Sequence, residues 1–225
     1  MSPSDPRPIG LLGGTFDPVH LGHLRLAEEA REALGLERVV WLPAGQPPHR
    51  RPPRESGAHR LAMVRLAVAG NGGFAVDAAE VRSAAPSYTA VSLERLRAQF
   101  GPEQPLVLLM GADAFLGLPA WHRWRDLFGL AHVAVASRPG YAIDAGTLPG
   151  ALAEEFAARR RPDSVSLGAA AAGAIVEFAI TPLAISASDI RERIASGRSV
   201  RYLIPDSVLD YIGRHSLYAV GSNGP

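Results

Sequence analysis

Five short apolar runs alternate with amphipathic stretches along the chain, and this alternation limits the folds available to it. The runs have the length of buried strands and cover residues 9–12, 39–42, 106–110, 132–136 and 175–180. Stretches with helical periodicity lie between several of them, at residues 24–34, 59–69 and 91–100. Apolar strands that alternate with helices are typical of a parallel sheet covered on both faces. We therefore expect a doubly wound α/β fold with a mostly parallel sheet.

Length and charge set further limits. A chain of 225 residues with 47% hydrophobic residues can bury one large core. We expect a single domain over residues 1–225, with a disordered tail at 1–7 and a flexible C-terminus at 217–225. The formal net charge of +1 gives no overall attraction to nucleic acid or to a membrane surface. Small phosphorylated ligands fit this balance better than polymers do.

Two residue types are missing. The chain has no cysteine, which excludes disulfides, thiolate metal sites and thiol nucleophiles and favours a reducing cytoplasm. No export signal or membrane span is visible, so we expect a cytoplasmic protein. Lysine is also absent, so phosphate must be bound by arginine, histidine and backbone N–H groups. The sequence allows a homo-oligomer but does not specify one.

The segment GGTFDPVHLGH, residues 13–23, joins an apolar run to a helical pattern. Glycines at positions 13 and 14 allow the backbone to approach a ligand closely. The N–H groups of such a turn, together with a helix N-terminus, favour an anion. The spacing matches neither the dinucleotide fingerprint nor a P-loop. The segment therefore predicts a phosphate site that includes Gly13 and Gly14.

His20 and His23 lie three positions apart at the start of the expected helix, which places both imidazoles on about one face. Each ring can donate a hydrogen bond to a phosphate oxygen, more strongly when it is protonated beside the anion. The alternative is that one histidine caps the helix and the other is a semi-buried structural residue. Metal ligation is a third option, but no second pair of ligands stands out to complete such a site.

Near the other end of the chain, the segment ISASDIRERI predicts a second helix with a phosphate-binding start. Ser186 and Asp189 have the spacing of a capping box. Ser188 and Arg191 are three residues apart, so a hydroxyl, a guanidinium and free N–H groups could converge on phosphate in the first turn. A capped surface helix with a solvated arginine is the alternative.

These residues carry a resemblance to a known family. Residues 13–23 match G-G-T-F-D-P-x-H-x-G-H, which is similar to the signature of bacterial nicotinate-nucleotide adenylyltransferases, within the H-x-G-H nucleotidyltransferase superfamily. ISASDIR resembles that family's I-S-S-T-x-I-R, with Ala187 and Ser188 where serine and threonine are usual. PPHR resembles P-P-H-K, with Arg50 in place of lysine. PSYT, GADAF, the Trp121–His122 pair and SRPGY are similar to further landmarks, in the same order.

The resemblance implies a Rossmann-like fold and a role for each matching residue. It implies catalytic roles for His20, His23 and Arg191. It implies ATP or phosphate contacts for Gly13, Gly14, Thr15, Phe16, Asp113, Arg138, Ser188 and Ile190. It implies mononucleotide contacts for His49, Arg50, Thr89, Trp121 and His122.

Three of these residues also have a structural alternative. Thr89 could cap the helix that follows it, and Asp113 could cap a helix that begins at Ala114. Trp121 and Trp124 are at helical spacing and could both belong to the core.

The reaction implied by the resemblance joins nicotinate mononucleotide to ATP and releases pyrophosphate. Mg²⁺ would be bound mainly through the ATP phosphates, and no protein ligand for it can be named. The same superfamily offers a rival, pantetheine-phosphate adenylyltransferase, which resembles only the first signature. A non-catalytic nucleotide sensor is a rival from another class, and the intact histidine pair argues against it.

Overall fold

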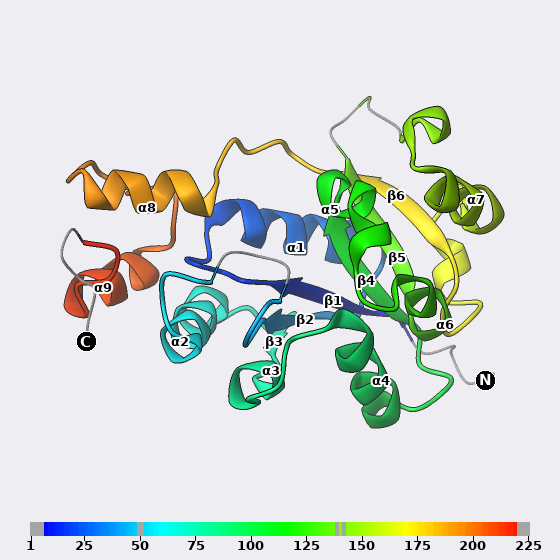
Figure 1. Cartoon of the computed structure of the whole chain (residues 1–225), viewed down its shortest axis with the longest axis horizontal. Coiled ribbons are helices and arrows are strands. Elements are labelled where there is room, and N and C mark those ends of the chain that lie inside the picture. Colours follow the sequence, from blue (N-terminus) through cyan, green and yellow to red (C-terminus); the bar gives the residue numbers. More distant parts are fainter. Residues whose placement is uncertain (1–6, 49–51, 138–139, 141–142, 220–225) are drawn as a thin grey trace.

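The computed structural model describes residues 7–48, 52–137, 140 and 143–219. Within these residues, six parallel strands form one sheet in the order β3-β2-β1-β4-β5-β6 (Figure 1). The strands are β1 (Ile9–Gly14), β2 (Arg38–Pro43), β3 (Phe74–Val76), β4 (Leu106–Gly111), β5 (His132–Ser137) and β6 (Ile175–Ala179). The strand order reverses between β1 and β4, as in doubly wound nucleotide-binding sheets. The expected fold class is confirmed.

Helices connect the strands and extend the chain beyond the last of them. They are α1 (Leu21–Ala33), α2 (Gly57–Val68), α3 (Ala79–Arg82), α4 (Thr89–Phe100), α5 (Ala112–Leu116), α6 (Leu127–Leu130), α7 (Gly150–Arg159), α8 (Ala187–Ala195) and α9 (Asp206–Arg214). All five expected strands and the three expected helices are present, with ends that differ by a few residues. The sequence pattern missed β3, because this edge strand is only three residues long and half-buried.

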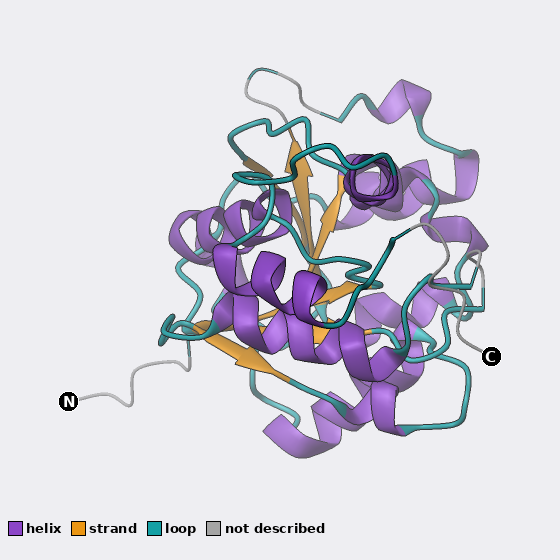
Figure 2. Cartoon of the chain, turned by 90° about the vertical axis from the view of Figure 1, so that its left-hand side faces the viewer, coloured by secondary structure: helices purple, strands orange, loops and turns teal. Residues whose placement is uncertain are grey.

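The sheet separates two apolar cores, because alternate residues of a strand point to opposite faces. On one face, Leu12, Trp41 and Leu109 pack with α1, α2, α8 and α9. On the other face, Leu11 and Leu108 pack with α4, α5, α6 and α7. Figures 1 and 2 show helices on both sides of the strands. Among the described residues, no helix is both long enough and apolar enough to cross a bilayer.

The C-terminal part of the chain returns to the beginning of the fold. Helix α9 lies beside α2, at the opposite end of the molecule from α7 (Figure 1). Leu217 and Tyr218 follow α9 and are 6% and 3% exposed. The expectation of a flexible C-terminus from residue 217 is therefore wrong for these two positions, because their side chains pack into the core. Residues 1–6 and 220–225 lie outside the described residues.

Candidate active site

Two adjoining cavities open at the carboxyl edge of the sheet. The larger, about 800 Å³, is lined by the ends of β4 and β5 and by residues after β6. The smaller, about 280 Å³, is lined by the ends of β1 and β2 and by the start of α4. Gly111, at the end of β4, lines both. The cavities meet beside the reversal of strand order, where open α/β sheets bind ligands.

The glycine turn after β1 forms part of the smaller cavity, which Gly13, Gly14 and Thr15 all line. A Cβ atom on Gly13 would meet no atom within 4 Å, so the backbone is open to a ligand there. A Cβ atom on Gly14 would lie 2.9 Å from the ring of Phe16. The two glycines thus have different roles, one in access and the other in packing.

Phe16 packs beneath the glycine turn with its side chain in the core. Its side chain is 2% exposed, and its backbone has a φ of 51°, in the left-handed region. The ring packs against Trp41 and meets the ring of His23 edge-on, with centroids 5.1 Å apart. The resemblance placed Phe16 among the phosphate-binding residues. Because its side chain is buried, it can act there only by fixing the backbone and the imidazole above it.

His20 and His23 lie together at the start of α1, at the N-cap and at the third helical position. Their rings stack with centroids 3.6 Å apart and planes inclined by 21°. The His20 N–H donates to Nδ1 of His23 at 3.3 Å, so a neutral His23 carries its proton on Nε2. A Cβ atom on Gly22 would lie 3.1 Å from Nδ1 of His20. The glycine between the histidines therefore leaves room for the stack.

Burial makes the two rings chemically different. His20 is 6% exposed, whereas His23 is half-buried and lines the smaller cavity. Burial lowers the pKa of His20 to about 4, because desolvation disfavours the imidazolium. His20 is thus neutral near pH 7 in this structure.

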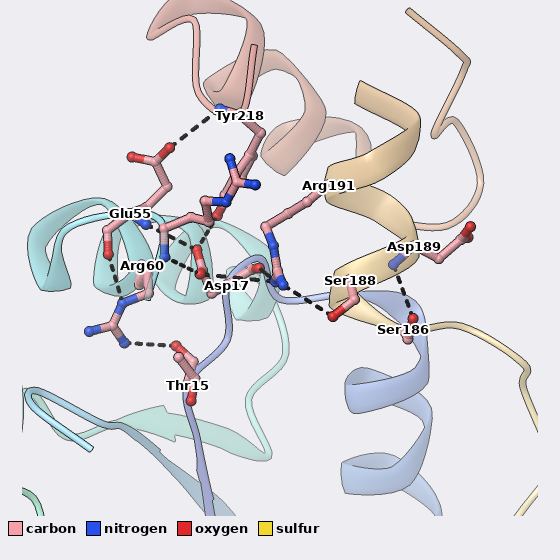
Figure 3. A network of polar contacts seen from close by, with 10 residues as sticks. Thr15, Asp17, Glu55, Arg60, Ser186, Ser188, Asp189, Arg191 and Tyr218 are labelled. Atoms are coloured by element: carbon pink, nitrogen blue, oxygen red, sulfur yellow. Dashed lines mark hydrogen bonds and ion pairs between the residues drawn. The ribbon is translucent and has the colours of Figure 1, made fainter. Parts of the chain in front are cut away.

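Helix α8 approaches the same region from the C-terminal half of the chain (Figure 3). The Ser186 hydroxyl accepts the N–H of Asp189 at 3.1 Å, which confirms the expected cap. Arg191 donates through Nη2 to the Ser188 hydroxyl at 3.1 Å and through Nη1 to the carbonyl of Asp17 at 2.6 Å. The guanidinium, 25% exposed, therefore ties α8 to the loop before His20. Ser188 and Arg191 do not line the two cavities themselves.

Asp17 is a buried carboxylate that joins three segments of the chain, and the sequence analysis gave it no role. It is 5% exposed and accepts the N–H of Arg54 at 2.7 Å and that of Glu55 at 3.3 Å. It also accepts the hydroxyl of Tyr218 at 2.7 Å. Burial and the charge of Asp17 raise the pKa of Tyr218, so its hydroxyl stays a donor.

Arg60, in α2, is a second residue that sequence reasoning missed. It is 1% exposed, and its guanidinium donates to the carbonyls of Thr15, Ala44, Gly45 and Glu55, at 2.6–3.1 Å. Burial lowers the pKa of Arg60, and the charge of Asp17 partly opposes that shift. The loops after β1 and β2 are therefore held to α2 by one side chain. A single arginine on an otherwise apolar helix face was the available signal.

Thr89, Trp121 and His122 all line the smaller cavity, as the resemblance implied. The N-cap of α4 is Tyr88, so Thr89 occupies the first helical position and does not cap the helix. The His122 ring lies 4.3 Å from that of Tyr88. Trp121 is half-buried at the cavity, whereas Trp124 is 8% exposed and belongs to the core. Trp121 packs against the same core as Trp124, but of the two tryptophans it alone lines the smaller cavity.

Ser87 joins the loop after β2 to the start of α4. Its hydroxyl accepts the N–H of Gly45 at 2.9 Å and that of Gln46 at 3.1 Å, and its own N–H donates to the Gln46 carbonyl. Ser87 also lines the smaller cavity. His49 and Arg50 follow in the same loop and, like Arg138, lie outside the described residues.

Asp113 lines the larger cavity, from the first turn of α5. That helix begins at Ala112 with Gly111 as its N-cap, so Asp113 does not cap a helix from Ala114. Ile190 was expected to contact ATP, but its side chain is fully buried and its N–H donates to the Ser186 carbonyl. Its place is in the core, because it lies on the inward face of the amphipathic helix α8.

Comparisons with known proteins agree with this geometry. Residues 11–193 match the cytidylyltransferase-like family. A relative from Dechloromonas aromatica (strain RCB), named "Probable nicotinate-nucleotide adenylyltransferase", is 61% identical over 94% of this chain and 97% of its own length. One from Methylococcus capsulatus with the same name is 48% identical over 94% of this chain and 99% of its own.

The fold is also found in solved structures. The nicotinic acid mononucleotide adenylyltransferase of Plasmodium falciparum, complexed with NaAD, matches with a TM-score of 0.69 at 14% identity. The match covers 94% of this chain and 97% of that one, and at this identity it supports the fold alone. The sequence relatives show the family more closely: the chain belongs to the nicotinate-nucleotide adenylyltransferases, within the cytidylyltransferase-like family.

Proposed function

We propose that the chain transfers the adenylyl group of ATP to nicotinate mononucleotide, producing deamido-NAD and pyrophosphate. The observation that carries the proposal is the meeting of two cavities at Gly111, one lined by Asp113 and the other by Thr89 and Trp121. Two substrates that react with each other need adjoining sites in which their phosphates meet. The relative at 61% identity, named for this activity, supports the same substrates.

In this reaction a phosphate oxygen of the mononucleotide attacks the α-phosphorus of ATP in line. The bond between the α-phosphorus and the oxygen bridging to the β-phosphorus breaks, and the β- and γ-phosphates leave as pyrophosphate. The chain needs no nucleophile of its own. Its part is to position the two phosphates and to stabilise the charge that develops between them.

Different residues around the glycine turn are assigned to positioning the phosphates and to stabilising their charge. Gly13 allows the backbone to come close to a phosphate, and His23, which lines the same cavity, is the imidazole that we assign to that phosphate. His20 remains neutral and holds the ring of His23 by stacking. Arg191, with Ser188, binds the triphosphate from the side of α8.

Mg²⁺ would be bound through the phosphates of ATP and would supply charge that offsets their negative charge. Among the described residues, no group of three His, Cys, Asp or Glu side chains is placed to hold a metal ion. This fits an ion that is carried by substrate phosphates and water, since Mg²⁺ seldom uses an all-protein cage.

The start of α4 suits the ring carboxylate of nicotinate. Its first-turn N–H groups, from Thr89 onward, lie at the positive end of the helix dipole. Trp121 offers a flat face to the pyridine ring. The amide of nicotinamide mononucleotide would place its own NH₂ donors against the N–H donors of the helix. The acid is therefore the preferred substrate.

A pyrophosphate-release assay tests this function. ATP is supplied with nicotinate mononucleotide, nicotinamide mononucleotide or phosphopantetheine, and products are identified by mass spectrometry. We expect deamido-NAD, with kcat/KM for the acid about 100-fold or more above that for the amide. Comparable values would refute the acid preference. Turnover with phosphopantetheine alone would favour that rival, and ATP binding without turnover would favour a sensor.

A further inference from the structure

Tyr218 joins the end of the described chain to the site. Its hydroxyl donates to Oδ1 of Asp17, 201 positions earlier, and its N–H donates to a Glu55 carboxylate oxygen at 3.3 Å. Its backbone has a φ of 64°, which is unfavourable for a side chain of this size. Side-chain and backbone contacts together hold Tyr218 in this conformation. The ring and its partners are drawn in Figure 3.

Asp17 is bound to Tyr218 on one side and to Arg191 on the other. Its carbonyl accepts Nη1 of Arg191, and its carboxylate oxygen Oδ2 lies 4.0 Å from the same nitrogen. Three residues later the chain reaches His20. The orientation of Asp17 therefore affects both the loop before the histidines and the guanidinium of α8.

The hydroxyl of Tyr218 balances the charge of Asp17. Without it, Oδ1 would keep only the N–H of Glu55, at 3.3 Å. A buried carboxylate that loses a donor is drawn to the nearest cation, because an unsatisfied charge is costly inside a protein. Among the described residues, Arg191 is the cation that lies within ion-pair distance of Asp17, at 4.0 Å. A closer ion pair would take the guanidinium away from a bound triphosphate.

We propose that Tyr218 is a positioning residue for ATP: through Asp17, its hydroxyl keeps Arg191 available to the triphosphate. The proposal rests on the proposed function for the identity of the ligand. It predicts an effect on ATP rather than on the mononucleotide, because Tyr218 acts through Arg191, which we assign to the triphosphate.

Tyr218→Phe tests the proposal, and Tyr211→Phe is its matched control. Tyr211, in α9, also loses a hydroxyl hydrogen bond, here to Nδ1 of His59 at 2.9 Å, but it has no contact with Asp17. We expect Tyr218→Phe to raise KM for ATP about tenfold or more, as for the loss of one hydrogen bond to a charged group. KM for nicotinate mononucleotide should change less than about twofold, and Tyr211→Phe should leave both values near those of the wild type.

A double-mutant cycle separates this role from general destabilisation. In an Arg191→Ala background, Tyr218→Phe should have almost no further effect on ATP, because the group through which it acts is gone. Independent, multiplicative effects would overturn the proposal, as would equal rises in both KM values. ATP binding is also measured by calorimetry, so that the coupling of Tyr218 to Arg191 is tested even if the wild type shows no turnover. Absence of turnover would then count against the proposed function alone.

Discussion

The imidazole rings of His20 and His23 stack at 3.6 Å, and only His23 lines a cavity. The buried ring is neutral at pH 7, whereas the half-buried one can donate toward a ligand. The burial of His20 favours a structural role for that ring, and the phosphate-binding role that we propose is therefore assigned to His23.

His23→Ala should lower kcat by more than tenfold while the protein stays folded. The imidazole stabilises charge that grows at the phosphates during the reaction, and loss of one such donor costs on the order of 100-fold. Steady-state kinetics and thermal unfolding check this. The control is His215→Ala, an exposed ring packed on Tyr211, for which we expect wild-type kinetics. An unchanged kcat with a lowered Tm would identify His23 as purely structural.

The buried His20 should make stability depend on pH. Its folded pKa of about 4 lies below the unfolded value near 6.5, so the unfolded chain binds the extra proton between these values. Stability is therefore full above pH 6.5 and falls as the pH drops toward 4, by roughly 3 kcal/mol from this group. Urea unfolding of the wild type and of His20→Asn at pH 7 and pH 4.5 measures this pH-dependent change in the free energy of unfolding. Parallel pH dependence in both proteins would contradict the assignment.

Arg191→Ala should weaken ATP use much more than Arg193→Ala does. Both residues lie in α8, but Arg193 pairs with Asp189 on the same helix, whereas Arg191 contacts Asp17 and Ser188. We expect kcat/KM for ATP to fall about 100-fold for Arg191→Ala, and less than about twofold for Arg193→Ala. If both variants matched the wild type in ATP titrations, α8 would not belong to the site.

Trp121→Ala should raise KM for nicotinate mononucleotide about tenfold and leave KM for ATP nearly unchanged. Removal of one aromatic stacking partner costs about 1–3 kcal/mol of binding. Trp124→Ala is the control, because it leaves a cavity in the core. It should lower Tm without a selective change in the KM of either substrate. The reversed pattern for Trp121, with ATP affected, would mean that the substrates occupy the opposite cavities.

Arg60→Leu should lower the free energy of unfolding by about 3 kcal/mol or more. The substitution leaves four carbonyl groups, in the loops after β1 and β2 and in the segment before α2, without their donor. Arg60→Lys should retain only part of the stability that Arg60→Leu loses, because one ammonium group cannot reproduce the hydrogen bonds of the forked guanidinium. Arg65→Leu, at an exposed position of the same helix, is the control, with a change within about 0.5 kcal/mol. Equal denaturation midpoints for the two leucine variants would show that the buried contacts contribute no net stability.

The sequence predicts the layers of the fold and the glycine turn well. Apolar runs mark the buried strands, and periodicity marks helices such as α1. These signals are local, because each depends on residues within one element. The start of α8 is predictable for the same reason, since the Ser186 hydroxyl caps the helix by accepting the N–H of Asp189, only three positions away.

The remaining parts of the site depend on contacts between distant segments. Arg60 donates to carbonyls, which every residue possesses, so no partner is visible in the sequence. Tyr218 was expected to lie in a flexible end, and its burial and its contact with Asp17, 201 positions earlier, show otherwise. Ile190 lies in a matching motif, but its burial is decided by the packing of α8 on the sheet.

The contact between Asp17 and Tyr218 also bears on synthesis of the chain. Asp17 is synthesised 201 residues before its partner, Tyr218. At roughly 5–20 residues per second, that delay is on the order of 10–40 s. During it the glycine turn and α1 can form, yet the carboxylate beneath them lacks its last donor. A nascent chain released before residue 218 would therefore contain both histidines without the contact to Asp17 that we propose for ATP binding.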